Sequence, residues 1–417
     1  MDLKRIRGTN DLIGEQLNYH EYVVNTAKDN AEKYCYIMLE TPIIEDSTVF
    51  HRTLGETSDI VSKETYTFLD RDKTSITLRP EFTAAIVRAF INGGFTQSIP
   101  VKFFSHGPAF RHERPQKGRY RQFHQINFES FGALTPNSDA EIITLSYDIL
   151  KALSLIDNTQ LEINTLGDIE SRKLYKKLLT EYFLRYENDL SDISKLRLKQ
   201  NPLRILDSKD LNEKKIIKGA PKLEDVINLE SKKYYYQMLE NLDILGIDYK
   251  KNHTLVRGLD YYTHTVFEFT TDLLGSQGAV FAGGRYDGLV KLMGGPDISA
   301  IGFAGGIERL VELLKLKKAL NFKKPFVYLV PIGESAQKYA IEFARDLRNS
   351  GFIVNMEFGM KLKKHMQRAD KQNASYALIF GDDELSQNKL KIKHMKTGEI
   401  KELNMNEVSS FLSSNLN

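Results

Sequence analysis

The sequence has only one cysteine, Cys35, in 417 residues. A single thiol excludes an internal disulfide and a zinc site built from several cysteines, and it fits a reducing compartment. No apolar run approaches the roughly 18 residues that span a bilayer, and the start of the chain lacks the apolar core of a signal peptide. These absences predict a cytoplasmic protein with no membrane partner.

Two common glycine-rich loops for nucleotide phosphates are also missing. No Gly-x-Gly-x-x-Gly follows a predicted strand, and Gly-x-x-x-x-Gly-Lys-Ser/Thr does not occur. If the chain binds a nucleotide, side chains must therefore hold the phosphates.

Composition and length indicate a globular protein of two or three domains. Hydrophobic residues make up 41% of the chain and charged residues 27%, and the length exceeds that of one ordinary core. Residues 321–417 carry 15 Lys and Arg against 11 Asp and Glu, within a net charge of +3. A mildly basic C-terminal segment is compatible with nucleic-acid binding, but the surplus alone does not decide it.

Apolar residues recur at helical spacing from Leu17 to about Leu39, which predicts an amphipathic helix that stops before Pro42. The helix could form a dimer surface or an internal part of the core. Cys35 falls within this pattern, so we expect it to be a small core residue.

The remaining patterns predict an α+β protein. Alternating runs at residues 65–69, 75–78 and 101–104 are typical of antiparallel strands, with one helix at 83–91. Residues 168–248 have helical periodicity and predict a helical insertion. Residues 325–417 alternate strand-length and helix-length segments, which predicts a C-terminal α/β domain with a parallel or mixed sheet.

Residues 110–125 contain four arginines, a lysine, a carboxylate and aromatic rings in a segment broken by Pro115 and Gly118. Guanidinium groups bind phosphate oxygens in a bidentate manner, and aromatic faces can stack on a base. A solvated basic turn is the simpler interpretation. Two further arginine segments, at 257–262 and 302–310, favour a hairpin that binds a nucleotide polyphosphate, although Arg309 alone would suggest a surface ion pair.

Acidic and amide residues accompany the arginines. Glu81 lies in a turn before the predicted helix, and Gln125 and Glu129 are four residues apart in a predicted strand, so they share one face. Such groups could hold an ammonium group and an imidazole. Each group alone is more often a surface residue or a helix cap.

Together these motifs resemble the histidyl-tRNA synthetase family of class II aminoacyl-tRNA synthetases, nearly from end to end. The matching segments are residues 7–12 (opening signature), 77–81 (amino-acid loop), 110–125 (motif 2), 302–310 (motif 3), and 257–262 and 283–287 (histidine-specific signatures). The resemblance implies a class II catalytic domain at 1–320, with an antiparallel sheet flanked by helices, and an anticodon-binding domain at 325–417. Phe82 and Asn127 depart from the family pattern, and we expect both to change packing around the histidine pocket.

The resemblance also implies roles for individual residues. Arg111 and Arg257 would be catalytic, with Arg257 stabilising the α-phosphoryl group in the transition state. The expected ATP-binding residues are Arg111, Glu113, Phe123 and Arg309. The expected histidine-binding residues are Glu81, Thr83, Arg111, Gln125, Glu129, Tyr261 and Tyr262.

The implied reaction joins L-histidine to ATP as histidyl-adenylate and then transfers the histidyl group to the 3′ end of tRNA(His). Mg²⁺ is expected with the ATP phosphates, but no metal site made of protein ligands alone. The resemblance further implies a homodimer. A non-catalytic regulatory relative is the main alternative, but such relatives usually lack the C-terminal domain and parts of the arginine signatures. Another class II synthetase is disfavoured by Tyr261 and Tyr262.

Overall fold

The computed structural model describes residues 3–54, 64–116, 118–256, 261–275, 278–317 and 320–416. The chain forms two compact units, Met1–Leu320 and Asn321–Asn417. Arg257 and the three residues after it lie outside the described residues, so the structure does not bear on the predicted role of that arginine.

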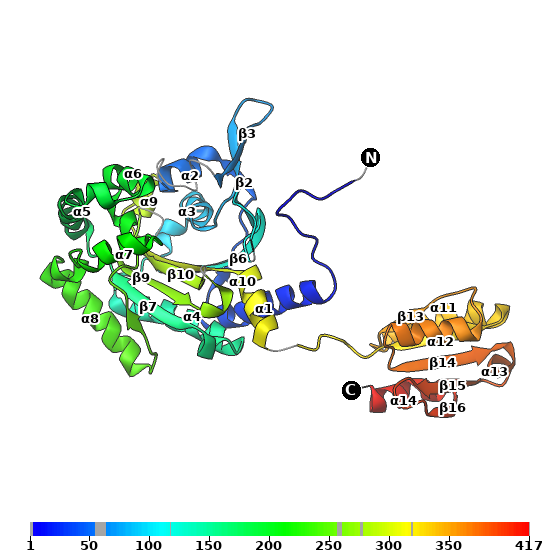
Figure 1. Ribbon diagram of the computed structural model, residues 1–417. Helices are drawn as coiled ribbons and strands as arrows, with labels where there is room; N and C mark the ends of the chain where they lie inside the picture. Colours follow the sequence, from blue (N-terminus) through cyan, green and yellow to red (C-terminus); the bar gives the residue numbers. More distant parts are fainter. Residues whose placement is uncertain are drawn as a thin grey trace. The chain divides into compact units, whose positions relative to one another are not determined.

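The first unit is built on an eight-stranded sheet with the order β1-β5-β6-β11-β10-β9-β7-β8 (Figure 1). Pairing is antiparallel from β5 to β7, and only the two edge strands β1 and β8 pair in parallel within this sheet. This architecture confirms the predicted antiparallel sheet. The strands are β1 (Ile37–Met38), β5 (Val101–Phe110), β6 (Gln122–Phe131), β7 (Gln160–Thr165), β8 (Lys250–Lys251), β9 (Thr263–Thr270), β10 (Ala279–Arg285) and β11 (Ala300–Gly306).

Three helices pack together against one face of this sheet: α1 (Glu15–Lys33), α4 (Pro136–Ala152) and α10 (Ile307–Lys317). Tyr19, Val23 and Ala27 of α1 are buried, and α1 contacts both α4 and α10. Of the two alternatives for this helix, the structure therefore shows an internal core element.

The prediction that Cys35 is a small core residue was wrong, because its side chain is exposed. Helix α1 ends at Lys33, and Cys35 adopts a left-handed backbone with φ of 58°. The backbone N–H of Tyr36 then donates to the carbonyl of Ala31 at 2.9 Å, which closes the helix end. Because this turn directs the chain away from the helix, the Cys35 side chain is exposed.

A smaller three-stranded antiparallel sheet has the order β2-β4-β3 and accompanies three short helices. Helix α3 contacts β6, so the start of this helix reaches the large sheet. The elements are β2 (Ile44–Asp46), β3 (Tyr66–Leu69), β4 (Ser75–Leu78), α2 (Ser47–Leu54), α3 (Thr83–Asn92) and α9 (Leu289–Leu292).

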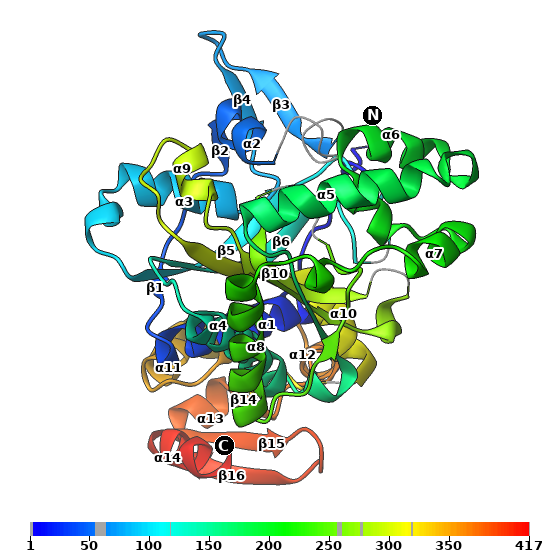
Figure 2. The same cartoon turned by 90° about the vertical axis from the view of Figure 1, so that its left-hand side faces the viewer.

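The segment predicted as a helical insertion folds as helices between β7 and β8, and α8 contacts α4 (Figure 2). These are α5 (Ile169–Leu184), α6 (Asp192–Gln200), α7 (Leu211–Lys218) and α8 (Leu229–Ile244). Tyr175 and Phe183 of α5 belong to the same buried apolar cluster as Tyr262. Arg172 also donates from Nη1 to the carbonyl of Tyr262 at 3.0 Å, so the insertion supports the segment next to the expected histidine pocket.

The second unit has a five-stranded sheet with the order β13-β12-β14-β15-β16. Strands β12, β13 and β14 pair in parallel, whereas β14, β15 and β16 pair antiparallel, which confirms the predicted mixed sheet. The elements are β12 (Val327–Ile332), α11 (Glu334–Asn349), β13 (Val354–Met356), α12 (Leu362–Lys371), β14 (Tyr376–Gly381), α13 (Asp382–Ser386), β15 (Lys389–His394), β16 (Ile400–Asn404) and α14 (Val408–Asn415).

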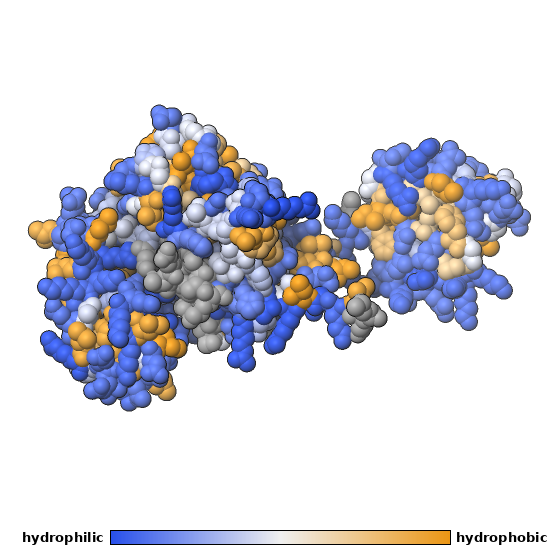
Figure 3. Space-filling view, turned by 90° about the horizontal axis from the view of Figure 1, so that it is seen from above, coloured by the Kyte–Doolittle hydropathy of each residue, from blue (hydrophilic) through white to orange (hydrophobic). Residues whose placement is uncertain are grey.

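Hydrophilic residues cover much of the visible face of each unit, and apolar residues are interspersed among them (Figure 3). Among the described residues, no helix combines the length and the apolar character that a bilayer-spanning segment requires.

Candidate active site

A cavity of about 800 Å³ opens above the central strands of the large sheet. This volume lies within the range of small-molecule and cofactor sites. Its wall combines the β5–β6 connection, the faces of β6, β9, β10 and β11, and part of the insertion. Residues that line it include Arg111, Glu113, Arg119, Phe123, Gln125, Glu268, Ala282, Ala304 and Arg309.

The β5–β6 hairpin supplies one side of the cavity. The Glu113 carboxylate accepts from Nη1 of Arg119 at 2.8 Å and lies 3.7 Å from Nη1 of Arg111. Nε of Arg111 donates to the carbonyl of Pro80 at 2.8 Å, and its guanidinium lies over the Phe123 ring at 5.2 Å. These contacts fix the direction of the Arg111 side chain before any substrate binds.

Arg309 approaches the same cavity from the first turn of α10. Its Nη1 donates to the carbonyl of Ala279 in β10 at 2.6 Å. Burial lowers the pKa of Arg309, and the positive charges of Arg119 and Arg111 lower it further. Guanidinium groups close enough to repel one another create a site that favours a polyanion.

A second, buried polar cluster lies at Glu129 in β6. The Glu129 carboxylate accepts from Oγ1 of Thr83 at 2.6 Å and from the hydroxyl of Tyr286, and only 1% of the residue is exposed. Burial raises the pKa of Glu129 from 4.5 to about 8, although both hydrogen bonds oppose this shift. In the ligand-free protein this carboxyl is therefore largely protonated at neutral pH.

Glu81 occupies the start of helix α3, beside this cluster. Its carboxylate accepts from the backbone N–H groups of Thr83 at 2.6 Å and of Ala84 at 2.9 Å, which are unpaired donors of the first helical turn. Burial raises the pKa of Glu81, whereas these donors and the charge of Arg111 oppose that shift. Arg111 thus connects the open cavity electrostatically with the buried cluster.

Three tyrosines complete the buried cluster. The Tyr261 and Tyr262 rings are 4.7 Å apart, and Tyr261 meets Tyr286 edge-to-face at 5.6 Å. Burial raises the pKa of Tyr261 and of Tyr286 well above 10.0, so both hydroxyls remain neutral donors.

Strand β6 also presents two amides without hydrogen-bond partners among the described residues. These are the buried Oε1 of Gln125 and both amide atoms of Asn127, on the face of β6 that carries Glu129. Gly302 of the neighbouring strand has no side chain, and an added Cβ would overlap the Glu129 carboxylate. Phe82 is fully buried and stacks on Arg79 at 3.9 Å, so it fills space next to the cluster.

The structure thus gathers the expected site residues into two groups. Arg111, Glu113, Phe123, Gln125 and Arg309 line the cavity, whereas the buried cluster contains Glu81, Thr83, Glu129, Tyr261 and Tyr262.

Our sequence-based site lacked one residue of the buried cluster. The hydroxyl of Tyr286 binds Glu129 directly, although we assigned Tyr286 no role. The signal was present, because Tyr286 belongs to the predicted signature at residues 283–287.

Comparisons with known proteins agree with this geometry. The profile of the family described as Histidyl-tRNA synthetase matches residues 8–310, and that of Anticodon binding domain matches residues 326–415. "Histidine--tRNA ligase" of Wolbachia pipientis wMel is 51% identical over 96% of this chain and 97% of its own length. The corresponding ligase of Gluconobacter oxydans is 49% identical over 98% and 97%.

Solved structures give the same result. The apo histidyl-tRNA synthetase of S. aureus superposes with a TM-score of 0.84 at 35% identity, covering 98% of this chain and 99% of that one. The antiparallel sheet and arginine-lined cavity are those of a class II aminoacyl-tRNA synthetase. More narrowly, the chain belongs to the histidyl-tRNA synthetase family.

The raised pKa of Glu129 leads to a stability prediction for the ligand-free protein. Replacing Glu129 with Gln removes a buried carboxyl that must ionise as pH rises from 4.5 through about 8. The free energy of unfolding of the wild type should therefore fall, relative to Glu129→Gln, by on the order of a few kcal/mol across that range. Urea unfolding at a series of pH values measures this difference.

Glu141→Gln is the matched control, because the Glu141 side chain is 46% exposed. It should show a much smaller pH-dependent difference. A difference between wild type and Glu129→Gln that stays constant with pH would contradict the buried, protonated state of Glu129.

Proposed function

We propose that this chain is an ATP-dependent histidine–tRNA ligase, which forms histidyl-adenylate and then esterifies the 3′ end of tRNA(His). The strongest support for this proposal is the match of residues 8–310 to the Histidyl-tRNA synthetase family. Relatives share about 50% sequence identity along nearly the whole chain. The arginine-lined cavity beside a buried polar cluster gives the proposal a physical basis.

The cavity is the proposed site of ATP. Arg111 and Arg309 would bind its phosphates, Phe123 would stack on adenine, and Glu113 would position the nucleotide. The existing hydrogen bonds of Arg111 to Pro80 and of Arg309 to Ala279 support these roles, because they preorient both guanidinium groups.

The buried cluster, together with the adjoining cavity residues Arg111 and Gln125, is the proposed site of histidine. Glu81, Thr83 and Gln125 would bind the α-amino group, and Arg111 would bind the carboxylate. Glu129, Tyr261 and Tyr262 would surround the imidazole, with the Glu129 carboxyl as a hydrogen-bond partner for a ring nitrogen. A site with buried polar groups rejects amino acids that leave those groups unpaired.

The first step would bring the histidine carboxylate to the α-phosphorus of ATP, with pyrophosphate leaving. Positioning and neutralisation of charge would account for most of the rate enhancement. Arg111 lies between cavity and cluster, where both reacting groups would meet. By resemblance we assign Arg257 the stabilisation of the α-phosphoryl group in the transition state.

Mg²⁺ would enter with ATP and neutralise part of its phosphate charge. The cavity fits such a metal–nucleotide complex, because Glu113 and Glu268 line it and both act electrostatically on Arg309. Mg²⁺ retains water ligands and needs only one or two carboxylates in addition to phosphate oxygens.

Arg309→Ala should raise the KM for ATP about 10- to 100-fold, because a charge-assisted hydrogen bond contributes roughly 1.5–3 kcal/mol. The KM for histidine should change much less, since histidine occupies the other group of residues. Histidine-dependent ATP–pyrophosphate exchange measures both constants. Arg345→Ala, an exposed arginine of α11, is the control, and an unchanged KM for ATP in Arg309→Ala would refute the assignment.

The C-terminal segment, residues 325–417, would bind the anticodon. Its support is the match of residues 326–415 to the Anticodon binding domain family and a compact fold of its own. The surplus of basic residues in this segment is consistent with binding to tRNA.

Deletion of residues 325–417 should reduce tRNA charging far more than pyrophosphate exchange, because adenylate formation does not require contact with the anticodon. Both rates can be measured on one preparation, with circular dichroism as the test of folding. Equal loss of both activities in a folded protein would argue against an anticodon-binding role.

We further propose a cytoplasmic homodimer. Support for the dimer comes from the exposed apolar residues of edge strand β1, of which Ile37 is 53% exposed and Met38 51%. An unpaired strand edge with apolar side chains is a typical site of association. Sedimentation velocity of the full chain tests this proposal, and a monomer at micromolar concentration would contradict it.

A further inference from the structure

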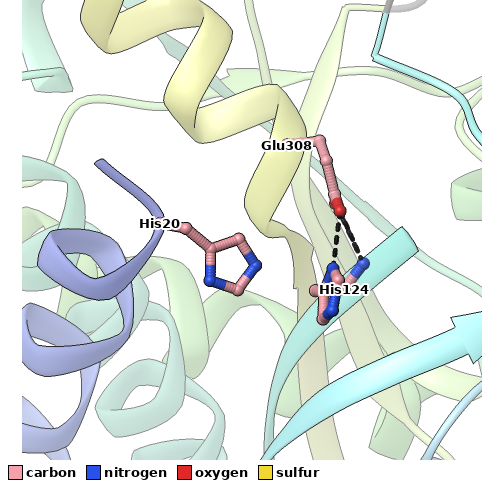
Figure 4. Close-up of side chains that lie close together, drawn as sticks. All are labelled: His20, His124 and Glu308. Atoms are coloured by element: carbon pink, nitrogen blue, oxygen red, sulfur yellow. Dashed lines mark hydrogen bonds and ion pairs between the residues drawn. The ribbon is translucent and has the colours of Figure 1, made fainter. Parts of the chain in front are cut away.

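One cluster of metal-binding side chains lies beside the cavity, and one of its members, Glu308, also lines the cavity. His20 of α1, His124 of β6 and Glu308 of α10 bring one ligand atom each within 4.8 Å of one another (Figure 4). His124 alternates along β6 with Phe123 and Gln125, which line the cavity, so its side chain points the opposite way. The three residues come from distant parts of the sequence and are brought together by packing of α1 and α10.

Hydrogen bonds already orient two members of the cluster. Nδ1 of His124 lies 2.8 Å from Oε1 of Glu308, and the same carboxylate accepts from the backbone N–H of His124 at 2.9 and 3.0 Å. The backbone contact holds the carboxylate in place independently of the imidazole. A cation could therefore bind between Nδ1 and Oε1, in place of their hydrogen bond, without releasing Glu308 from β6.

His20 contributes a ring nitrogen that needs a partner. Its Nε2 is buried and has no hydrogen-bond partner among the described residues. The ring meets that of His124 edge-to-face at 4.5 Å, and the nitrogen farther from the backbone faces His124 (Figure 4).

We propose that His20, His124 and Glu308 form a binding site for Zn²⁺ or a similar divalent transition metal. Two imidazoles and one carboxylate are a common zinc ligand set, and a water molecule would occupy the fourth tetrahedral position. Zinc–ligand bonds of about 2.0–2.2 Å place neighbouring ligands roughly 3.3 Å apart. Side-chain movements would bring the three ligand atoms from within 4.8 Å of one another to this spacing, and the hydrogen between Nδ1 and Oε1 would be released to water.

Occupancy of this site would tie three elements together next to the ATP cavity. Glu308 precedes Arg309 in the first turn of α10, so a metal bound to Glu308 would fix that turn to α1 and β6. The bound ion would therefore stabilise the folded protein by an amount that grows with the logarithm of the free zinc concentration divided by Kd. The two imidazole ligands would select zinc over the Mg²⁺ that accompanies ATP.

Equilibrium dialysis of the full-length, chelator-treated protein against buffered Zn²⁺ tests the proposal. The wild type should bind one zinc ion per chain, and thermal unfolding should shift upwards with zinc. His20→Ala should weaken zinc binding by about 100-fold or more, because loss of even a supporting residue commonly costs 10- to 100-fold. His51→Ala is the matched control, since His51 is an exposed histidine of α2 outside the cluster.

His20→Gln, which keeps a polar side chain, serves as a second variant if His20→Ala unfolds. Co²⁺ in place of Zn²⁺ should give the visible absorption of a tetrahedral site in the wild type and not in either variant. Absence of zinc from the wild type would overturn the proposal and leave a buried water as the partner of His20. Equal zinc binding by wild type and the His20 variants would also overturn it.

Discussion

Alternation of side chains along β6 is the constraint on which the rest of the site depends. This central strand sends Phe123, Gln125 and Glu129 to the side of the cavity and the buried cluster, and His124 and Phe128 to the side covered by α1. A shift of one residue in its pairing with β5 or β11 would exchange the two sets. The register with both neighbours is continuous over the strand, so the polar cluster and the apolar packing are fixed together.

Burial also changes the acidity of Glu129. The apolar cluster that joins α3, the insertion and the tyrosines excludes water from this carboxyl and raises its pKa. A carboxyl held by Thr83 and Tyr286 in a dry environment discriminates strongly, because an unsuitable ligand leaves buried groups unpaired. The helical insertion therefore contributes to the buried cluster, our proposed histidine site, indirectly, through the apolar residues that pack around it.

Much of the fold could be predicted from the sequence, because hydrophobic periodicity and proline positions act locally. Strands β3 and β4 of the small sheet, the start of β5 in the large sheet, the helix at Thr83 and the mixed C-terminal sheet followed from such patterns. The end of α1 did not, since a left-handed residue at Cys35 stops the helix without glycine or proline. Local pattern cannot show that a non-glycine residue will accept this strained backbone.

The residues of the candidate site likewise fall into those that local motifs predict and those that only long-range packing brings together. Arginine and glycine motifs identified the cavity residues, because their composition is unusual. The motifs did not show which distant residues meet, even where the residue itself lay in a motif, as Tyr286 does at residues 283–287. Tyr286 meets Glu129 only through pairing of distant strands, and His20 meets His124 only because α1 packs on the sheet.

The central claim is that one site combines ATP and histidine through fixed guanidinium groups and a buried carboxyl. Amino-acid-dependent ATP–pyrophosphate exchange, measured with each proteinogenic amino acid in turn, tests it most directly. The account predicts exchange with histidine and at most background exchange with every other amino acid. Exchange supported by a different amino acid, or none with histidine, would contradict it.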